Sequence, residues 1–186
     1  MKTRNLFSTM LVALVMVATT QVFAQETKMV GGAAMYPTKN IVENAVNSKD
    51  HTTLVAAVKA AGLVETLQGE GPFTVLAPTN AAFEKLPEGT VANLLKPENK
   101  KALQGVLTYH VIAGKNSAAA IIQDIKDGGG TAEWTTVNGQ KLWGMLDGDK
   151  VQIKDQAGNV ATVTIADVNQ SNGVIHVIDT VLLPEM

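Results

Sequence analysis

The sequence contains no cysteine among its 186 residues. This absence excludes a disulfide framework, which stabilises many small exported domains, and it excludes lipid attachment to a cysteine beside a cleavage site. The folded chain must therefore be held together by a packed apolar core.

Aromatic residues are scarce, at 4% of the chain, and the 15 basic residues are scattered along it. The formal net charge is −2. A groove for nucleic acid needs a concentrated basic footprint together with aromatic side chains for stacking. We therefore expect no nucleic-acid partner.

Long hydrophobic runs are also missing beyond the N-terminus, since no stretch approaches about eighteen uninterrupted apolar residues. The first residues show a different pattern. Lys2 and Arg4 precede a short apolar core at residues 10–18, and Ala24 is a small residue suited to cleavage. We predict a signal peptide at residues 1–24 and an exported protein, periplasmic or extracellular, that is not an integral membrane protein.

The predicted mature chain is long enough for one domain of ordinary size. Residues 25–38 contain few apolar side chains and include glycine and proline, so we expect a flexible N-terminal leader there. The domain is expected at residues 39–186. Its first part has apolar residues at helical spacing, and Asp50 or Thr52 is placed to cap the second helix. We expect His51, among polar residues at that helix start, to be exposed.

A short apolar run that opens with Phe73 predicts a buried strand, which Pro78 stops. Thr79 and Asn80 then offer side-chain oxygens to cap a following helix, and Phe83 lies on the inward face of that helix. A strand that feeds a helix is also typical of phosphate-binding and nucleophile turns. Here the nearby glycines precede the strand and no G-x-S-x-G pattern occurs, so we interpret the stretch as a structural corner.

The second half of the chain, from Lys115 onward, is predicted to consist mostly of β-strands in a meandering antiparallel sheet. Asn138-Gly139 is its clearest local signal, because both residues tolerate the positive φ of a two-residue hairpin. The last stretch, residues 173–184, is apolar on both faces. A strand of that kind belongs in the middle of a structure.

The histidines are the natural candidates for catalysis or metal binding, but their spacing supports neither. We expect His110 and His176 to be hydrogen-bonded structural residues. His176 and Asp179 fall on opposite faces of one strand, so they cannot pair with each other. The acidic turns after residue 146 lack the spacing and the bidentate glutamate of a calcium loop. We predict no catalytic residue, no metal, no cofactor and no enzymatic activity.

Three motifs in this sequence resemble those of the fasciclin-like (FAS1) domain family. Residues 74–83 are similar to its first signature, Tyr109-His110 to its Tyr-His motif, and residues 172–179 to its second signature. The motifs occur in the family's order. The fold that the resemblance implies is α+β, with helices packed on a wedge of two mostly antiparallel β-sheets.

The resemblance extends from about Lys39 to Pro184, and residues 32–47 also resemble secreted bacterial single-domain members. Those include the mycobacterial secreted antigens, which carry a disulfide that this chain cannot form. The function implied is cell adhesion, or interaction at the cell surface or with the extracellular matrix, by non-catalytic binding of a protein or glycan. In animal members the Tyr-His region is associated with integrin binding, so Tyr109 and His110 are the candidate interaction residues.

Two alternatives to adhesion stay open from the sequence. The first is a small-ligand carrier or, as a weaker alternative, an enzyme, either of which requires a concave pocket with convergent polar groups. The second is an envelope-associated structural or stress protein.

Deletion of residues 173–186 should unfold the domain, because a strand that is apolar on both faces contributes to the core on both sides. We expect the shortened chain to lose the cooperative thermal transition that the full chain shows by circular dichroism. A truncated protein that still unfolds cooperatively would contradict the central placement of this strand.

Overall fold

The computed structural model describes residues 27–185 of the chain, and the predicted signal peptide at residues 1–24 lies outside them. In chain order the elements are β1 (Lys28–Val30), β2 (Ala33–Met35), α1 (Ile41–Ala45), η1 (Lys49–His51), α2 (Thr52–Ala61), α3 (Val64–Gln68), β3 (Phe73–Pro78), α4 (Asn80–Glu84), α5 (Thr90–Leu94), η2 (Pro97–Asn99), α6 (Lys100–Tyr109), β4 (Val111–Ala113), α7 (Ala118–Asp127), β5 (Thr131–Thr135), β6 (Lys141–Asp147), β7 (Lys150–Lys154), β8 (Val160–Gln170) and β9 (Gly173–Ile178).

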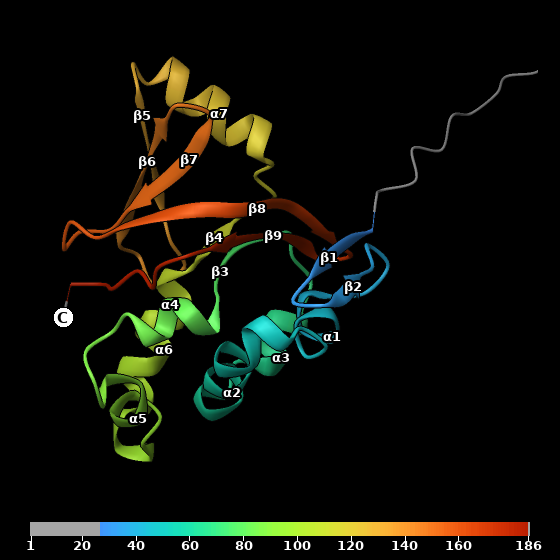
Figure 1. Ribbon diagram of the computed structural model, residues 1–186, viewed down its shortest axis with the longest axis vertical. Helices are drawn as coiled ribbons and strands as arrows, with labels where there is room; N and C mark the ends of the chain where they lie inside the picture. The colour runs from blue at the N-terminus through green and yellow to red at the C-terminus, as the bar shows by residue number, and fades with distance from the viewer. Residues whose placement is uncertain (1–26, 186) are drawn as a thin grey trace, which may run out of the picture.

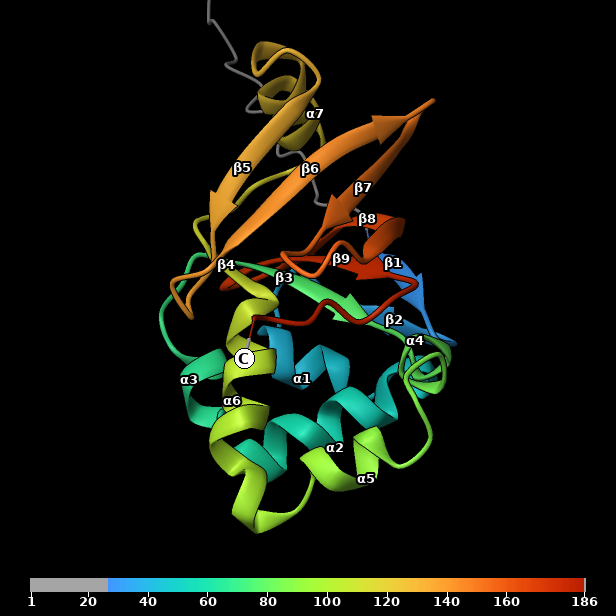
Figure 2. The same ribbon diagram turned by 90° about the vertical axis from the view of Figure 1, so that its left-hand side faces the viewer.

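The described residues form one seven-stranded sheet, in the order β4-β3-β9-β8-β7-β6-β5, and a separate β1-β2 hairpin. Figure 1 shows helices α1 to α6 on one side of β3 and β9, whereas β5, β6 and β7 rise on the other side with α7 against them. The view in Figure 2, turned by a right angle, shows the same division. The α+β class expected from the sequence is confirmed.

The sheet takes its wedge shape at β8, the long strand that both halves of the sheet share. Its first residues pair with β7, and from Val163 onward it pairs with β9. The β8–β9 register is irregular between Val163 and Ile165 and again between Ile165 and Val168, and Asp167 has a φ of 54°. Bulges bend a strand and increase its twist, so β8 can belong to two differently oriented halves.

The centre of the sheet is a parallel pair, β3 with β9, whose register runs from Phe73 opposite Gly173 to Pro78 opposite Ile178. All six residues of β9 are buried, which agrees with a central C-terminal strand, although the strand ends at Ile178. A Cβ added to Gly173 would lie 2.1 Å from the carbonyl oxygen of Phe73, so the close approach of the chains requires glycine.

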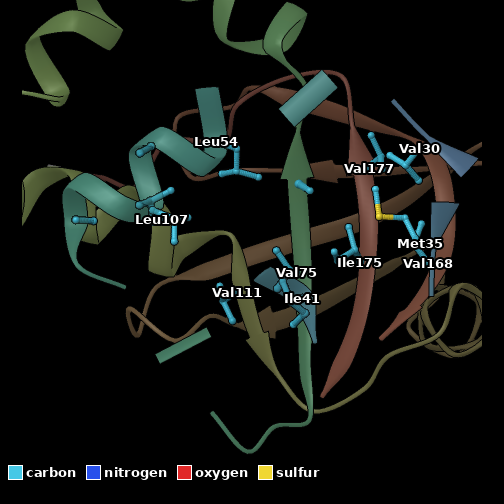
Figure 3. Close-up of a cluster of buried hydrophobic side chains, with 14 of the residues drawn as sticks. Val30, Met35, Ile41, Leu54, Val75, Leu107, Val111, Val168, Ile175 and Val177 are labelled. Atoms are coloured by element: carbon cyan, nitrogen blue, oxygen red, sulfur yellow. The ribbon is translucent and has the colours of Figure 1, made fainter. Parts of the chain in front are cut away.

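Two large apolar clusters fill the spaces on either side of this sheet. The first lies between the helices and the β3–β9 region, and Figure 3 shows side chains from both layers gathered in it. The second lies between α7 and the β6–β8 part of the sheet, and includes Ile125, Leu142 and Ile153. These clusters are the packed core that a chain without disulfides needs.

The leader predicted at residues 25–38 differs from expectation, because its described part forms the β1–β2 hairpin. Val30 and Met35 are buried in the first cluster. Gly31 and Gly32 have φ values of 57° and 75°, which let the chain reverse within two residues. Contact with the core therefore orders a segment whose short strands carry little signal of their own.

Two further expectations for the second half need correction. The segment read as β after Lys115 contains helix α7, whose N-cap Ser117 accepts from the amide of Ala120 at 3.2 Å. The turn at Asn138 is also longer than two residues, because the amide of Thr136 already donates to the carbonyl of Gln140 at 2.9 Å. Of the turn residues, glycine alone has a positive φ, as in a three-residue loop.

The corner after β3 has the expected local form and one unexpected connection. Thr79 caps α4 by accepting from the amide of Ala82 at 3.3 Å, as predicted. The side chain of Asn80 instead caps α2: its Oδ1 accepts from the amide of Thr53 at 3.0 Å, and its Nδ2 donates to the carbonyl of Lys49 at 2.8 Å. One residue therefore anchors the start of α2 to the end of β3.

Replacing Asn80 with alanine should lower the free energy of unfolding by about 1 to 2 kcal/mol, because it leaves the start of α2 uncapped. Asn80→Asp keeps the accepting oxygen and loses only the donor to Lys49, so we expect it to retain most of the stability. Urea unfolding of the two variants beside the parent chain measures the difference. Equal losses in both variants would show that the cap oxygen contributes little.

Candidate functional site

Tyr109 and His110, the Tyr-His pair, lie at the junction of α6 and β4, inside the structure. Tyr109 is fully buried, and its hydroxyl donates to the carbonyl of Lys141 at 2.7 Å and accepts from the amide of Gln156 at 3.2 Å. Burial raises the pKa of this hydroxyl, which keeps it protonated as a donor. Tyr109 thus joins the end of α6 to β6 and to the β7–β8 turn.

His110 connects the same helix end to the C-terminal segment. Its Nδ1 lies 2.8 Å from the carbonyl of Val106, and its Nε2 accepts from the amide of Leu182 at 3.1 Å. A carbonyl can only accept, so Nδ1 carries the proton and the ring is neutral. Burial lowers the pKa of His110 to about 4, against 6.5 for the free side chain.

Neither side chain of the pair is available at the surface, because Tyr109 is 0% and His110 2% exposed. Their hydrogen-bonding atoms are already occupied within the fold. Direct contact with a partner, which the family resemblance suggests, stays a prediction. Any influence on binding would have to pass through the segments that these side chains hold in place.

His176 and Asp179 hydrogen-bond with different partners and do not pair with each other, as predicted. Nε2 of His176 donates to the carbonyl of Asn116 at 2.9 Å, and its Nδ1 accepts from the amide of Asp167 at 3.3 Å. Burial lowers the pKa of His176. The ring therefore braces the bulged part of β8 against the loop before α7.

Asp179 follows β9 and accepts from the amide of Thr162 at 2.8 Å and from the hydroxyl of Thr180 at 3.1 Å. Its carboxylate lies 3.6 Å from the ammonium of Lys85. Partial burial acts to raise the pKa of Asp179, but these hydrogen bonds and the lysine charge outweigh it, and the pKa is lowered. The group ties β9 to β8.

The remaining predicted motif residues have structural positions. Pro78 is buried at the end of β3, and Phe73 and Phe83 are half-buried against the first cluster. Within residues 27–185 no three histidine, aspartate or glutamate side chains gather as metal ligands. No helix in that range is long and apolar enough to cross a membrane.

The prediction that His51 is exposed is wrong, because this side chain is 97% buried, with 3% exposure. The β1–β2 hairpin packs against η1, the helical turn that contains His51: the amide of Lys49 donates to the carbonyl of Gly31 at 3.1 Å. Nδ1 of His51 lies 2.9 Å from the hydroxyl of Ser48. Burial lowers the pKa of His51, opposed in part by the nearby carbonyl of Ala77.

An apolar cavity of about 90 Å³ lies between the helices and the sheet, and His51 is part of its lining. Other lining residues come from both layers, including Leu54 of α2 and Val75 of β3. Sequence reasoning missed the cavity because its lining has the same apolar pattern as a closed core. The buried histidine is an unusual feature of this lining, and its burial depends on segments distant in the sequence, such as the one that contains Ala77.

A second hollow is open to solvent and is lined mainly by polar residues and glycines, with a volume of about 430 Å³. It lies where the chain before β3 meets the β8–β9 turn, and its lining comprises residues 68–72, residues 170–173 and Lys115. Asn172 fixes its floor: Nδ2 donates to the carbonyls of Leu67 at 2.9 Å and Gly69 at 3.0 Å, while Oδ1 accepts from an amide of α1 at 3.0 Å. We call this hollow the polar groove.

Comparison with known proteins places these features in context. The family model described as "Fasciclin domain" matches residues 49–184. Protein sll1483 of Synechocystis sp. is 48% identical over 162 residues, which cover 87% of this chain and 83% of that protein. The cell surface glycolipoprotein MPB83 of Mycobacterium bovis is 36% identical over 160 residues, which cover 83% of this chain and 64% of that protein.

The solved structures include a similar one, a FAS1 domain pair from the insect cell adhesion molecule fasciclin I. It matches with a TM-score of 0.56 at 25% sequence identity, and the match covers 70% of this chain and 43% of that chain. The helices on a wedge-shaped sheet described above are thus a fold already seen in an adhesion molecule.

Acid should destabilise the protein through His110. Because the folded pKa of about 4 lies below the unfolded value of 6.5, the neutral ring stabilises the fold fully above pH 6.5. This contribution, on the order of 3 kcal/mol, is lost as the pH falls toward 4. We expect His110→Ala to cost more stability at pH 7 than at pH 4.5 in urea unfolding. Parallel stability curves for parent and variant across this range would contradict the assignment.

Proposed function

The chain belongs to the fasciclin domain family, and from that premise we propose that it is an exported module for cell adhesion or for interaction at the cell surface or with the extracellular matrix. It acts by non-catalytic binding of a surface or matrix protein or glycan. The similar insect structure comes from a cell adhesion molecule, and MPB83 is named as a cell surface protein, which supports a surface role. The signal peptide predicted at residues 1–24 would be the export signal that this role requires.

The side chains best suited to catalysis serve the fold instead, and this supports binding over chemistry. Both ring nitrogens of His110 and of His176 are engaged with backbone groups. The hydroxyl of Tyr109 is engaged twice in the same way. A general acid or base must reach a substrate, and these groups are buried and occupied.

The polar groove is the surface that suits a partner best. The observation that carries the proposal is the set of hydrogen bonds by which Asn172 fixes the base of the groove. Asn172 holds three elements together beneath it, so the groove keeps its shape without a partner. Gly71 and Gly173 bring backbone close on either side: a Cβ on each would lie 2.1 Å from a neighbouring carbonyl oxygen. A preorganised hollow loses little conformational entropy on binding.

The exposed side chains of the polar groove offer both charge and hydrogen bonds. Glu70, Lys115 and Ser171 are exposed, and backbone polar groups line the same hollow. A loop of a surface protein or a glycan presents hydroxyl, amide and carboxylate groups that match such a lining. We therefore place the partner contact here, away from the Tyr-His pair.

The full exported chain should be retained on cells, matrix or envelope preparations, and a charge change in the polar groove should weaken that retention. We expect Lys115→Glu to lower the affinity roughly tenfold, because it reverses a charge at the contact. Lys154→Glu is the matched control: Lys154 is also exposed but lies on β7, outside the groove. Quantitative binding to immobilised surface preparations measures both.

The possible outcomes distinguish an error in the proposed contact surface from an error in the proposed function. Retention that Lys115→Glu and Lys154→Glu reduce equally would remove the polar groove as the contact surface. A parent chain that none of the preparations retains would contradict the adhesion function itself.

A further inference from the structure

Two residues of opposite charge line the polar groove: Glu70, on the segment before β3, and Lys115, on the segment after β4. Both are exposed. The ion pairs within residues 27–185 join other residues, so the fold neutralises neither of these charges by pairing. A carboxylate and an ammonium that line one hollow without pairing are free to attract charged groups of a partner.

Hydrogen bonds on both sides of Glu70 fix the backbone that carries it. The carbonyl of Gly69, directly before Glu70, accepts from Nδ2 of Asn172 at 3.0 Å. On the other side, the amide of Phe73 donates to the backbone carbonyl of Asn172 at 3.0 Å. The segment before β3 is thus bound at both ends to the β8–β9 turn, which forms the opposite wall of the groove.

The backbone beside Lys115 is bound to the same segment. The amide of Gly114 donates to the carbonyl of Pro72 at 2.9 Å. The main-chain positions of Glu70 and Lys115 are therefore fixed relative to each other before any partner arrives. Two opposite charges on a fixed backbone form a pattern that a partner must match.

The rest of the lining contributes hydrogen-bonding groups and no aromatic ring. Gln68 and Ser171 are exposed and carry an amide and a hydroxyl. Aromatic side chains supply the broad apolar faces on which the rings of ligands stack. Because none of the lining residues is aromatic, the groove has little to hold the ring of a sugar. Recognition here depends on charge and on hydrogen bonds.

The two signs of charge select among the partners that a surface or matrix contains. A neutral glycan has no group for either charge, and an acidic glycan would be attracted by Lys115 and repelled by Glu70. A protein segment with a basic side chain close to an acidic one satisfies both charges. The volume of about 430 Å³ is that of a pocket for a small ligand, so the groove accommodates a short segment.

We propose that the polar groove binds a short exposed segment of a surface or matrix protein in which a lysine or arginine lies close to an aspartate or glutamate. The basic side chain of that segment pairs with Glu70, and the acidic one pairs with Lys115. This inference rests on the proposed function, because it names the class of partner for the same groove.

Reversal of the charge at Glu70 separates this class of partner from the others. Glu70→Lys should lower the affinity of the exported chain for immobilised surface or matrix preparations about tenfold, as Lys115→Glu does. The double variant Glu70→Lys/Lys115→Glu should lower it about a hundredfold, because the effects of two separate contacts add. Glu88→Lys is the matched control, since Glu88 is exposed and lies outside the groove. It should bind like the parent chain.

Treatment of the preparations before the assay identifies the kind of molecule that is bound. Digestion with proteinase K should abolish retention of the parent chain. Periodate oxidation, which cleaves the vicinal diols of glycans, should leave retention unchanged. The variants should keep the melting temperature of the parent chain, because exposed side chains outside ion pairs contribute little to stability.

Several results would overturn the inference and leave the proposed function standing. Tighter binding by Glu70→Lys than by Glu88→Lys would show a partner with negative charge alone, such as an acidic glycan or an anionic lipid. Retention that survives proteinase K and is lost after periodate would show a glycan. Recovery of affinity in the double variant would show that Glu70 and Lys115 act on each other instead of on a partner.

Two further results have different consequences. A parent chain that sediments as a dimer, when Glu70→Lys sediments as a monomer, would assign the groove to a second copy of this chain and overturn the inference. A parent chain that no untreated preparation retains would contradict the proposed function itself, and the inference would fall with its premise.

Discussion

The parallel pairing of β3 with β9 is the constraint on which the rest of the structure depends. Parallel strands cannot be joined by a tight turn and need a crossover connection. Here Phe73 stands opposite Gly173, so nearly everything between them is that connection. It includes helices α4 to α6 on one side of the pair, β4 on its edge, helix α7, and the β5–β7 hairpins that return through β8, whereas α1 to α3 precede β3. The two signature motifs meet because they are these two strands.

A pairing over such a separation must be secured at its ends, and buried or partly buried polar groups do this. Asn172 ties the start of β9 to the chain before β3. At the other end His110 holds the amide of Leu182, and the buried carboxylate of Asp155 accepts from the amide of Leu183 at 2.9 Å. Each bond satisfies a backbone group that secondary structure leaves free. The Tyr-His motif is thus explained by its structural role, which is to hold the C-terminal segment against the rest of the fold.

Local signals in the sequence were sufficient for the corner and for the central strand. The cap at Thr79 depends on neighbouring residues alone, and an apolar run such as 173–178 has no stable place except between other strands. The helix α7 also had a local signal, since Ile121 and Ile125 are four residues apart and both buried, but the strands and turns that follow favoured a meandering sheet for the whole segment.

What the sequence did not reveal depends on contacts between distant segments. The hairpin of residues 28–35 is ordered by the core that it covers, and His51 is buried among residues distant in the sequence, since the carbonyl of Ala77 lies near its ring. Asn80 caps a helix that precedes it by more than twenty residues, which no local pattern indicates. The direction of β9 relative to β3 and the cavity beneath them likewise follow from packing, because the same apolar residues would line a closed core.

The interior cavity and the polar groove share a wall, the segment that joins α3 to β3. Leu67 and Phe73 line the cavity, whereas the residues between them, 68–72, line the groove. Asn172 fixes this segment through hydrogen bonds to two of its carbonyls and through its own carbonyl, which accepts from the amide of Phe73 at 3.0 Å. Coupling between two sites needs an element with two arrangements. A segment held by these hydrogen bonds has only one arrangement. Filling the cavity should therefore leave the shape of the groove unchanged.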